Sequence, residues 1–141
     1  MGSKFLSALI DTSHDETITS FTIAVSDQTS NLATGTGVLT FQMPFGFELT
    51  EIPKASVKTV ATGSTIIFDI NVAGSTILST KLSIDISETG SSSAGTPAVL
   101  SSTSIANNAI VSIDIDQVGS TNTGIGALIY LIGRKTWAII L

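Results

Sequence analysis

Strict alternation of apolar and polar residues, repeated along the sequence, strongly limits what this chain can fold into. Residues 111–116 read Val-Ser-Ile-Asp-Ile-Asp, and residues 82–87 read Leu-Ser-Ile-Asp-Ile-Ser. Successive side chains of a β-strand point to opposite faces, so such a segment buries one face and leaves the other in water. A helix would scatter the same residues around its circumference. The alternation therefore predicts half-buried strands.

Clear alternation predicts strands at residues 21–25, 39–43, 66–72, 82–87 and 111–116, and weaker patterns predict strands at 47–52, 55–60, 98–101 and 127–132. Short glycine-containing turns follow several of them. Residues 61–64 separate two strands closely enough to form a hairpin, and 73–75 and 118–120 are similar turns. Residues 29–37 and 90–97 are the longest loops. We find no segment long enough for a crossover helix, which argues against a parallel sheet.

A chain of 141 residues has room for one domain with one core. We predict an all-β fold, an antiparallel β-sandwich or jelly roll of about eight strands. A small barrel is the alternative architecture. The sandwich domain is expected over residues 20–141. Residues 1–19 lack the alternation and are interpreted as an N-terminal arm.

Two apolar patches lie at the ends of the sequence. The arm carries Phe5, Leu6 and Ile10, which could share one side of a short helical turn, and the chain ends in Trp-Ala-Ile-Ile-Leu. An apolar tail is costly to leave in water, so it either adds a strand or lies buried in a partner. The predicted partner contacts are Phe5, Leu6, Ile10, Arg134, Trp137 and Ile139, with Arg134 and Lys135 placed to pair with acids of that partner.

Composition excludes several other partners. The net charge is −5, and the six basic residues are scattered except for Arg134 and Lys135. Nucleic acids and anionic membranes attract clustered lysines and arginines, so neither is expected as a partner. The same two residues interrupt the apolar stretch 125–141, which should therefore not span a bilayer. The apolar patch near the start of the chain is too short to form the hydrophobic region of a secretory leader.

Two groups of polar residues are candidate chemical sites. Oxygen-bearing side chains on predicted strands could bind Ca²⁺, but they are better interpreted as outward, solvated residues; they are Asp69, Asn71, Asp85, Asp114 and Asp116. His14 stands beside Asp11, Asp15 and Glu16 on the predicted arm, which offers no rigid scaffold for a catalytic triad. We therefore predict no catalytic residues, no metal, no cofactor and no enzymatic activity.

Residues 34–133 resemble a family of small virion proteins of tailed phages. The resemblance rests on Met-Pro-Phe-Gly-Phe at 43–47, Thr-Gly-Ser-Thr-Ile-Ile-Phe-Asp-Ile-Asn at 62–71, Ser-Thr-Lys-Leu-Ser-Ile-Asp at 79–85 and Asp-Ile-Asp-Gln-Val-Gly-Ser at 114–120. It implies a β-sandwich on a virion, either a head decoration (cement) protein or a module of a fibre or spike. It carries over no catalytic residue.

The resemblance and the apolar ends together predict a structural protein of the capsid surface. We expect it to bind the major capsid protein or another virion protein, as a homo-oligomer that is a trimer, and to stabilise the shell by binding its assembled form. A tail fibre, spike or glycan-binding receptor module is the alternative. It would need exposed aromatic residues on loops, and the sequence offers few.

Overall fold

The computed structural model describes residues 17–136 and places twelve strands and one 3-10 turn in them. The strands are β1 (Thr19–Ala24), β2 (Gly35–Gln42), β3 (Phe47–Leu49), β4 (Lys54–Thr59), β5 (Ile66–Val72), β6 (Ser75–Thr76), β7 (Leu78–Thr80), β8 (Leu82–Ile84), β9 (Val99–Leu100), β10 (Ser104–Ile105), β11 (Ile110–Gln117) and β12 (Ile125–Lys135). The 3-10 turn, η1, spans Ser91–Ser93. No helix among these residues is long and apolar enough to cross a membrane.

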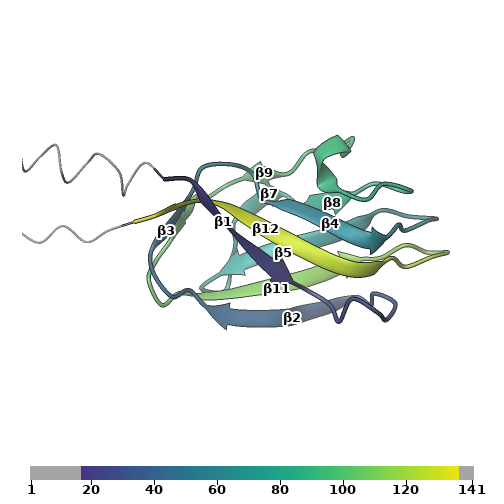
Figure 1. The fold of residues 1–141 in the computed structure, drawn as a ribbon, viewed down its shortest axis with the longest axis horizontal. Coiled ribbons are helices and arrows are strands. Elements are labelled where there is room, and N and C mark those ends of the chain that lie inside the picture. The colour runs from purple at the N-terminus through teal and green to yellow at the C-terminus, as the bar shows by residue number, and fades with distance from the viewer. Residues whose placement is uncertain (1–16, 137–141) are drawn as a thin grey trace, which may run out of the picture.

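The strands form two main antiparallel sheets (Figure 1). In sheet A, β12 pairs with β1 along one edge and with β4 and β3 along the other, and β10 extends β3. In sheet B the order is β2-β11-β5-β6, with β8 also paired to β5. A small third sheet joins β7 to β9. The predicted antiparallel, all-β architecture is confirmed.

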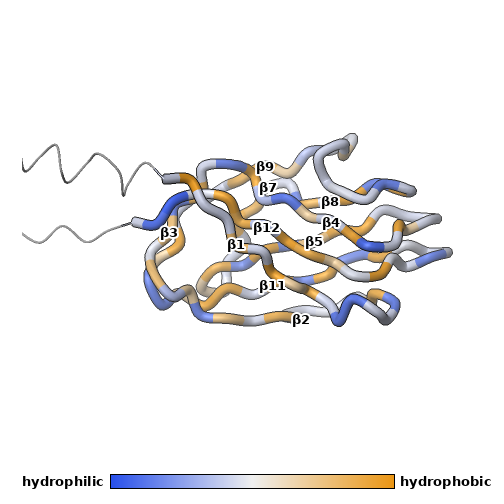
Figure 2. Tube along the Cα trace, in the orientation of Figure 1, coloured by the Kyte–Doolittle hydropathy of each residue, from blue (hydrophilic) through white to orange (hydrophobic). Residues whose placement is uncertain are grey.

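The core lies between the sheets and is built by the alternation. Strand β11 shows the rule, because Val111, Ile113 and Ile115 are buried while Asp116 is exposed. The largest fully buried side chains are Phe47, Phe68, Met43, Ile66, Ile70, Leu82, Ile84, Ile105, Ile113, Ile129, Leu131 and Val111. Figure 2 colours much of β12 as hydrophobic, because this central strand is apolar on both faces. These positions confirm the predicted sandwich; the strand order does not confirm a jelly-roll connection.

Two of the three predicted turns do not close hairpins. Residues 61–64 link β4 of sheet A to β5 of sheet B, and residues 118–120 link β11 of sheet B to β12 of sheet A. The two connections instead pair with each other, because the Thr62 N–H donates to the Asn122 carbonyl at 3.0 Å and the Thr121 N–H to the Thr62 carbonyl at 3.0 Å. The turn at 73–74 does close a hairpin between β5 and β6.

Two strands end earlier than the alternation predicts. Strand β8 stops at Ile84, and Ile86 is 46% exposed beyond it; β3 stops at Leu49, and Ile52 is 43% exposed. Three short strands were missed, namely β6, β7 and β10, since two or three residues are too few to show a period. The start of β1 at Thr19 falls on the last residue of the predicted arm.

The register places both ends of the described chain at one end of the sandwich. Thr19, where β1 starts, lies opposite Gly133 near the end of β12. The loop between β2 and β3 reaches the same place, because the Thr136 N–H donates to the Gly46 carbonyl at 2.9 Å. We call this end the terminal pole, defined by Thr17, Ile18, residues 44–46 and residues 134–136; it lies at the left of Figure 1.

Candidate binding surfaces

A cluster of three phenylalanines packs together at the terminal pole. Phe21 of β1 packs against Phe47 of β3 with ring centroids 5.1 Å apart and an edge-on geometry, and against Phe45 at 5.6 Å. Phe47 is fully buried, whereas Phe45 is half-buried. The Lys135 ammonium lies over the Phe45 ring, 4.7 Å from its centroid, at a cation–π distance. The Met-Pro-Phe-Gly-Phe segment at 43–47 thus shapes this pole.

The terminal pole also exposes apolar surface. Ile18, one residue before β1, is 51% exposed, and Pro44 is exposed in the β2–β3 loop. Apolar surface of this kind can be covered by a partner. Of the predicted partner contacts, Arg134 lies at this pole, whereas Phe5, Leu6, Ile10, Trp137 and Ile139 lie outside the described residues.

Arg134 lies half-buried on the outer face of β12, directly opposite Glu48 of β3. A cross-strand pair of opposite charge is favourable, although Arg134 forms no ion pair within residues 17–136. The Glu48 carboxylate instead accepts hydrogen bonds from the Thr103 hydroxyl and, at 3.1 Å, from the Ser104 hydroxyl. The role of Arg134 in binding a partner stays a prediction.

Most of the acidic residues considered for Ca²⁺ form a polar network on the outer face of sheet B. Asp69 corrects the prediction that all of them are solvated, because it is only 6% exposed. Its carboxylate accepts a hydrogen bond from the Thr76 hydroxyl at 2.5 Å and lies 3.5 Å from the Lys81 ammonium. Lys81 also reaches the Asp116 carboxylate at 2.6 Å, and this hydrogen bond raises the pKa of Lys81 above its ordinary value. Burial of Asp69 is therefore offset by protein partners.

The other acidic groups of this set are also engaged by protein donors. Asp114 accepts the Gly37 N–H at 2.7 Å and the Asn71 amide at 3.0 Å. Asp85 accepts the Gly95 N–H at 2.8 Å. Within residues 17–136 no group of three or more such side chains is arranged to hold a metal ion. The geometry supports a structural interpretation of these residues.

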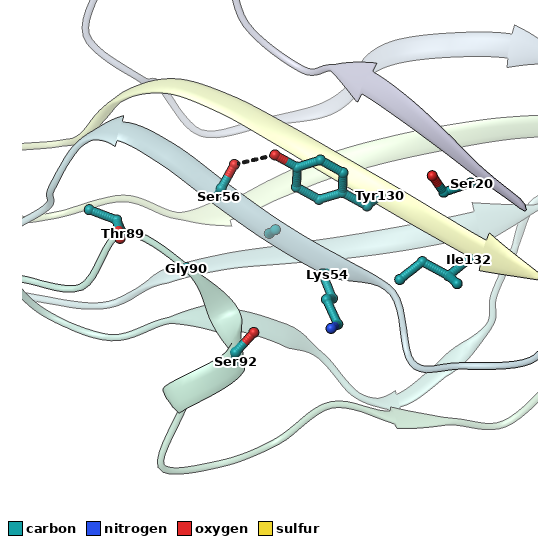
Figure 3. Close-up of a pocket in the computed structure, with 9 residues that line it drawn as sticks. Ser20, Lys54, Ser56, Thr89, Gly90, Ser92, Tyr130 and Ile132 are labelled. Atoms are coloured by element: carbon teal, nitrogen blue, oxygen red, sulfur yellow. Dashed lines mark hydrogen bonds between the residues drawn. The ribbon is translucent and has the colours of Figure 1, made fainter.

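A shallow groove of about 370 Å³ lies on the outer face of sheet A (Figure 3). Tyr130 of β12 forms one wall, and its hydroxyl lies 2.9 Å from the Ser56 hydroxyl of β4. Lys54 projects toward the η1 turn that carries Ser92, and Ile132 lies farther along β12. The complete lining is Ser20, Lys54, Ala55, Ser56, Thr89, Gly90, Ser92, Tyr130 and Ile132.

Sequence reasoning missed this groove. Its signal was present in residues 127–132, where every residue is apolar or aromatic, so that Leu128, Tyr130 and Ile132 had to face outward once Ala127, Ile129 and Leu131 faced the core. The contribution of residues 89–92 could not be predicted, since it depends on how a long loop folds back against β4. The groove offers hydroxyl groups, an ammonium and an aromatic ring.

Comparisons with known proteins leave the family of the chain open. No protein-family model matches it, no curated protein matches it, and no solved structure matches it. The resemblance to tailed-phage virion proteins therefore stays a prediction from residues 34–133.

Proposed function

We propose that this protein is a structural component of a virion, a decoration (cement) protein that binds the outer capsid shell as a homotrimer. The observation that carries the proposal is the terminal pole. The pairing of Thr19 with Gly133 joins the arm sequence and the tail sequence to the same end of the sandwich. The apolar arm and the apolar tail are therefore both attached at one end of the sandwich, beside exposed Ile18.

Binding through one pole fits the physical requirements of a cement protein. Such a protein needs to bury area across neighbouring shell subunits, on the order of 1,000–2,000 Å² for a stable contact. It stabilises the shell because it binds the assembled form and not the separated subunits. Phe5, Leu6, Ile10, Trp137 and Ile139 would supply apolar contacts, and Arg134 would supply a charge at their margin.

The test is co-sedimentation with empty phage heads assembled from the major capsid protein encoded in the same genome. Deleting residues 1–16 leaves β1 intact and should abolish binding, as should Trp137→Ala combined with Ile139→Ala. Ile86→Ala is the matched control, because Ile86 is 46% exposed but follows β8 away from the terminal pole. Full occupancy of the heads by the deleted protein would refute a role for this pole.

The groove of sheet A supports one alternative, a glycan-binding module of a fibre or spike. Tyr130 offers a ring for stacking, Ser56 and Ser92 offer hydroxyl groups, and Lys54 offers a donor for an acidic sugar. Saturable binding on a glycan array, lost in Tyr130→Ala and retained in Ile86→Ala, would favour this alternative over the decoration protein.

A further inference from the structure

The sandwich is closed along one side and open along the other. On the closed side, the free edge of β4 is covered by the 89–91 segment: the Val57 N–H donates to the Thr89 carbonyl at 2.9 Å, and the Ala55 N–H to the Ser91 hydroxyl at 2.9 Å. Strand β10 covers the edge of β3 in the same way. Lys54 and Lys58 add exposed charges to this edge, a common protection against unwanted strand pairing.

The opposite side is formed by β1 and β2, the outermost strands of sheets A and B. Strand β8 and turn η1 pack against β4, which places β1 and β2 together on the side away from them (Figure 1). No other strand of the described chain pairs with the outer edge of either one. We call this side the open side and define it by β1 and residues 38–42 of β2.

Some backbone groups along the open side take no part in strand pairing within residues 17–136. The Val25 N–H donates to Ala127 and the Met43 N–H to Ala109, so the odd-numbered residues of both strands face their neighbours within the sheet. Because antiparallel pairing alternates along a strand, the N–H and C=O groups of the even-numbered residues point outward. Thr22 and Thr40 are central examples, and both side chains are exposed.

The core is incompletely covered at the same place. Phe21 and Ile23 of β1 and Leu39 and Phe41 of β2 pack against the core, yet all four are only half-buried. The corresponding residues of the central strands, such as Phe68 and Ile113, are fully buried. Covering the four side chains would remove more apolar surface from water, which favours association.

The distribution of charge indicates that another copy of this chain binds the open side. Between residues 17 and 47 Asp27 is the sole charged residue, and neither β1 nor β2 carries a charge or a proline. The whole chain has a net charge of −5, so two copies repel each other through most of their surfaces. The uncharged open side allows two copies to approach without that repulsion. The β1 edge of one copy can then pair with the β2 edge of the next, which is the heterologous contact that a ring of three copies needs.

We propose that the open side is the self-association surface of this protein, where the β1 and β2 edges of neighbouring copies meet. This inference rests on the homo-oligomer of the proposed function and names the surface that builds it. The bulge of β2 at residues 35–39 confines regular pairing to the second half of that strand, whereas β1 is regular throughout.

The experiment measures the molar mass of the full chain by light scattering after size exclusion. Wild type should have a mass three times the 14.5 kDa of one chain, and Thr22→Lys combined with Thr40→Lys should lower it threefold. Thr59→Lys, at an exposed position of the covered strand β4, should leave the mass unchanged. Circular dichroism establishes that each variant is folded.

Hydrogen exchange on wild type provides a readout that needs no variant. The Thr22 and Thr40 amides should exchange more slowly in concentrated than in dilute protein, and the Thr59 amide should exchange equally in both. A wild-type mass of one chain, or a folded double variant that keeps the wild-type mass, would overturn the inference. Failure of wild type to bind heads while the double variant still dissociates would overturn the decoration function alone.

Discussion

Thr19 and Gly133 lie directly opposite each other in sheet A, so β1 begins where β12 is about to end. Gly133 also pairs with Leu49 of β3 on its other side, which makes it the point where three strands meet. A Cβ atom at Gly133 would collide with the Glu48 carbonyl. The close approach of β12 to β3 at the terminal pole therefore depends on the missing side chain.

Gly133→Ala should destabilise the protein by about 1–3 kcal/mol, because the strands must shift to admit a methyl group in a packed region. Chemical denaturation measures this loss. Gly74→Ala is a useful contrast, since a Cβ at Gly74 meets no atom within 4 Å and its cost comes from the positive φ of 85°. A Gly133→Ala variant as stable as wild type would show that β3 and β12 are not held this closely.

Ile113→Ala should destabilise the fold by about 2–5 kcal/mol, because Ile113 is fully buried on β11 and its truncation leaves a cavity. Ile110→Ala, on the same strand but 47% exposed, should change stability by less than about 0.5 kcal/mol. Denaturant midpoints of the two variants check this. Equal losses of stability in the two variants would contradict the assignment of Ile113 to the buried face of β11 and Ile110 to its exposed face.

The two isoleucines show how much of the fold the sequence predicts. The sequence pattern identified nine strands, and clear alternation assigned the buried face of five of them, since burial of one face leaves a period of two. It could not assign strands to sheets: residues 61–64 have the composition of a hairpin turn but cross between sheets, because the partner of β4 is β12, far away in sequence. Such long-range pairings leave no local trace.

The binding surfaces were predicted less completely. Asp69 has the same alternating neighbours as Asp114, yet it is buried, because Thr76 of β6 and Lys81, between β7 and β8, contact its carboxylate. The groove at Tyr130 and the open side both depend on which strands lie at a sheet edge. The apolar termini were visible in the sequence, but their attachment to one pole follows from the register of β1 and β12.

Asp27 predicts a pH dependence of stability. Hydrogen bonds from the Ser30 N–H and hydroxyl and from the Thr29 N–H lower the pKa of this carboxyl from 3.8 to about 2. Because the folded pKa lies below the unfolded one, the charged form stabilises the fold above about pH 4, and this contribution is lost as the pH falls through about 2.

The melting temperature of wild type should therefore exceed that of Asp27→Ala at neutral pH, and the difference should narrow between about pH 4 and pH 2. Asp27→Asn retains an acceptor oxygen without the titrating charge, so its own contribution should not vary over this range. A difference between wild type and Asp27→Ala that stays constant down to about pH 2 would show that the turn at residues 27–30 is not held by the carboxylate.

Asp114 stabilises the bulge in the edge strand β2. Its carboxylate accepts the Gly37 N–H at 2.7 Å, at the place where the pairing of β2 with β11 skips from Leu39 to Gly35. Gly37 has a φ of +60°, so the carboxylate holds the bulge in a conformation that disfavours regular pairing on the outer edge. Asp114→Ala should free the Gly37 amide and cost about 1 kcal/mol of stability.

Hydrogen exchange at Gly37 measures this effect directly, and exchange should become roughly fivefold faster in Asp114→Ala, the factor that corresponds to about 1 kcal/mol. Asp116→Ala is the matched control on the same strand, because Asp116 bonds to Lys81 and not to β2. If the bulge limits how far β2 can pair with a neighbouring copy, Asp114→Ala should also form higher oligomers than wild type in light scattering. Unchanged Gly37 exchange would mean that the backbone of β2 keeps the bulge without Asp114.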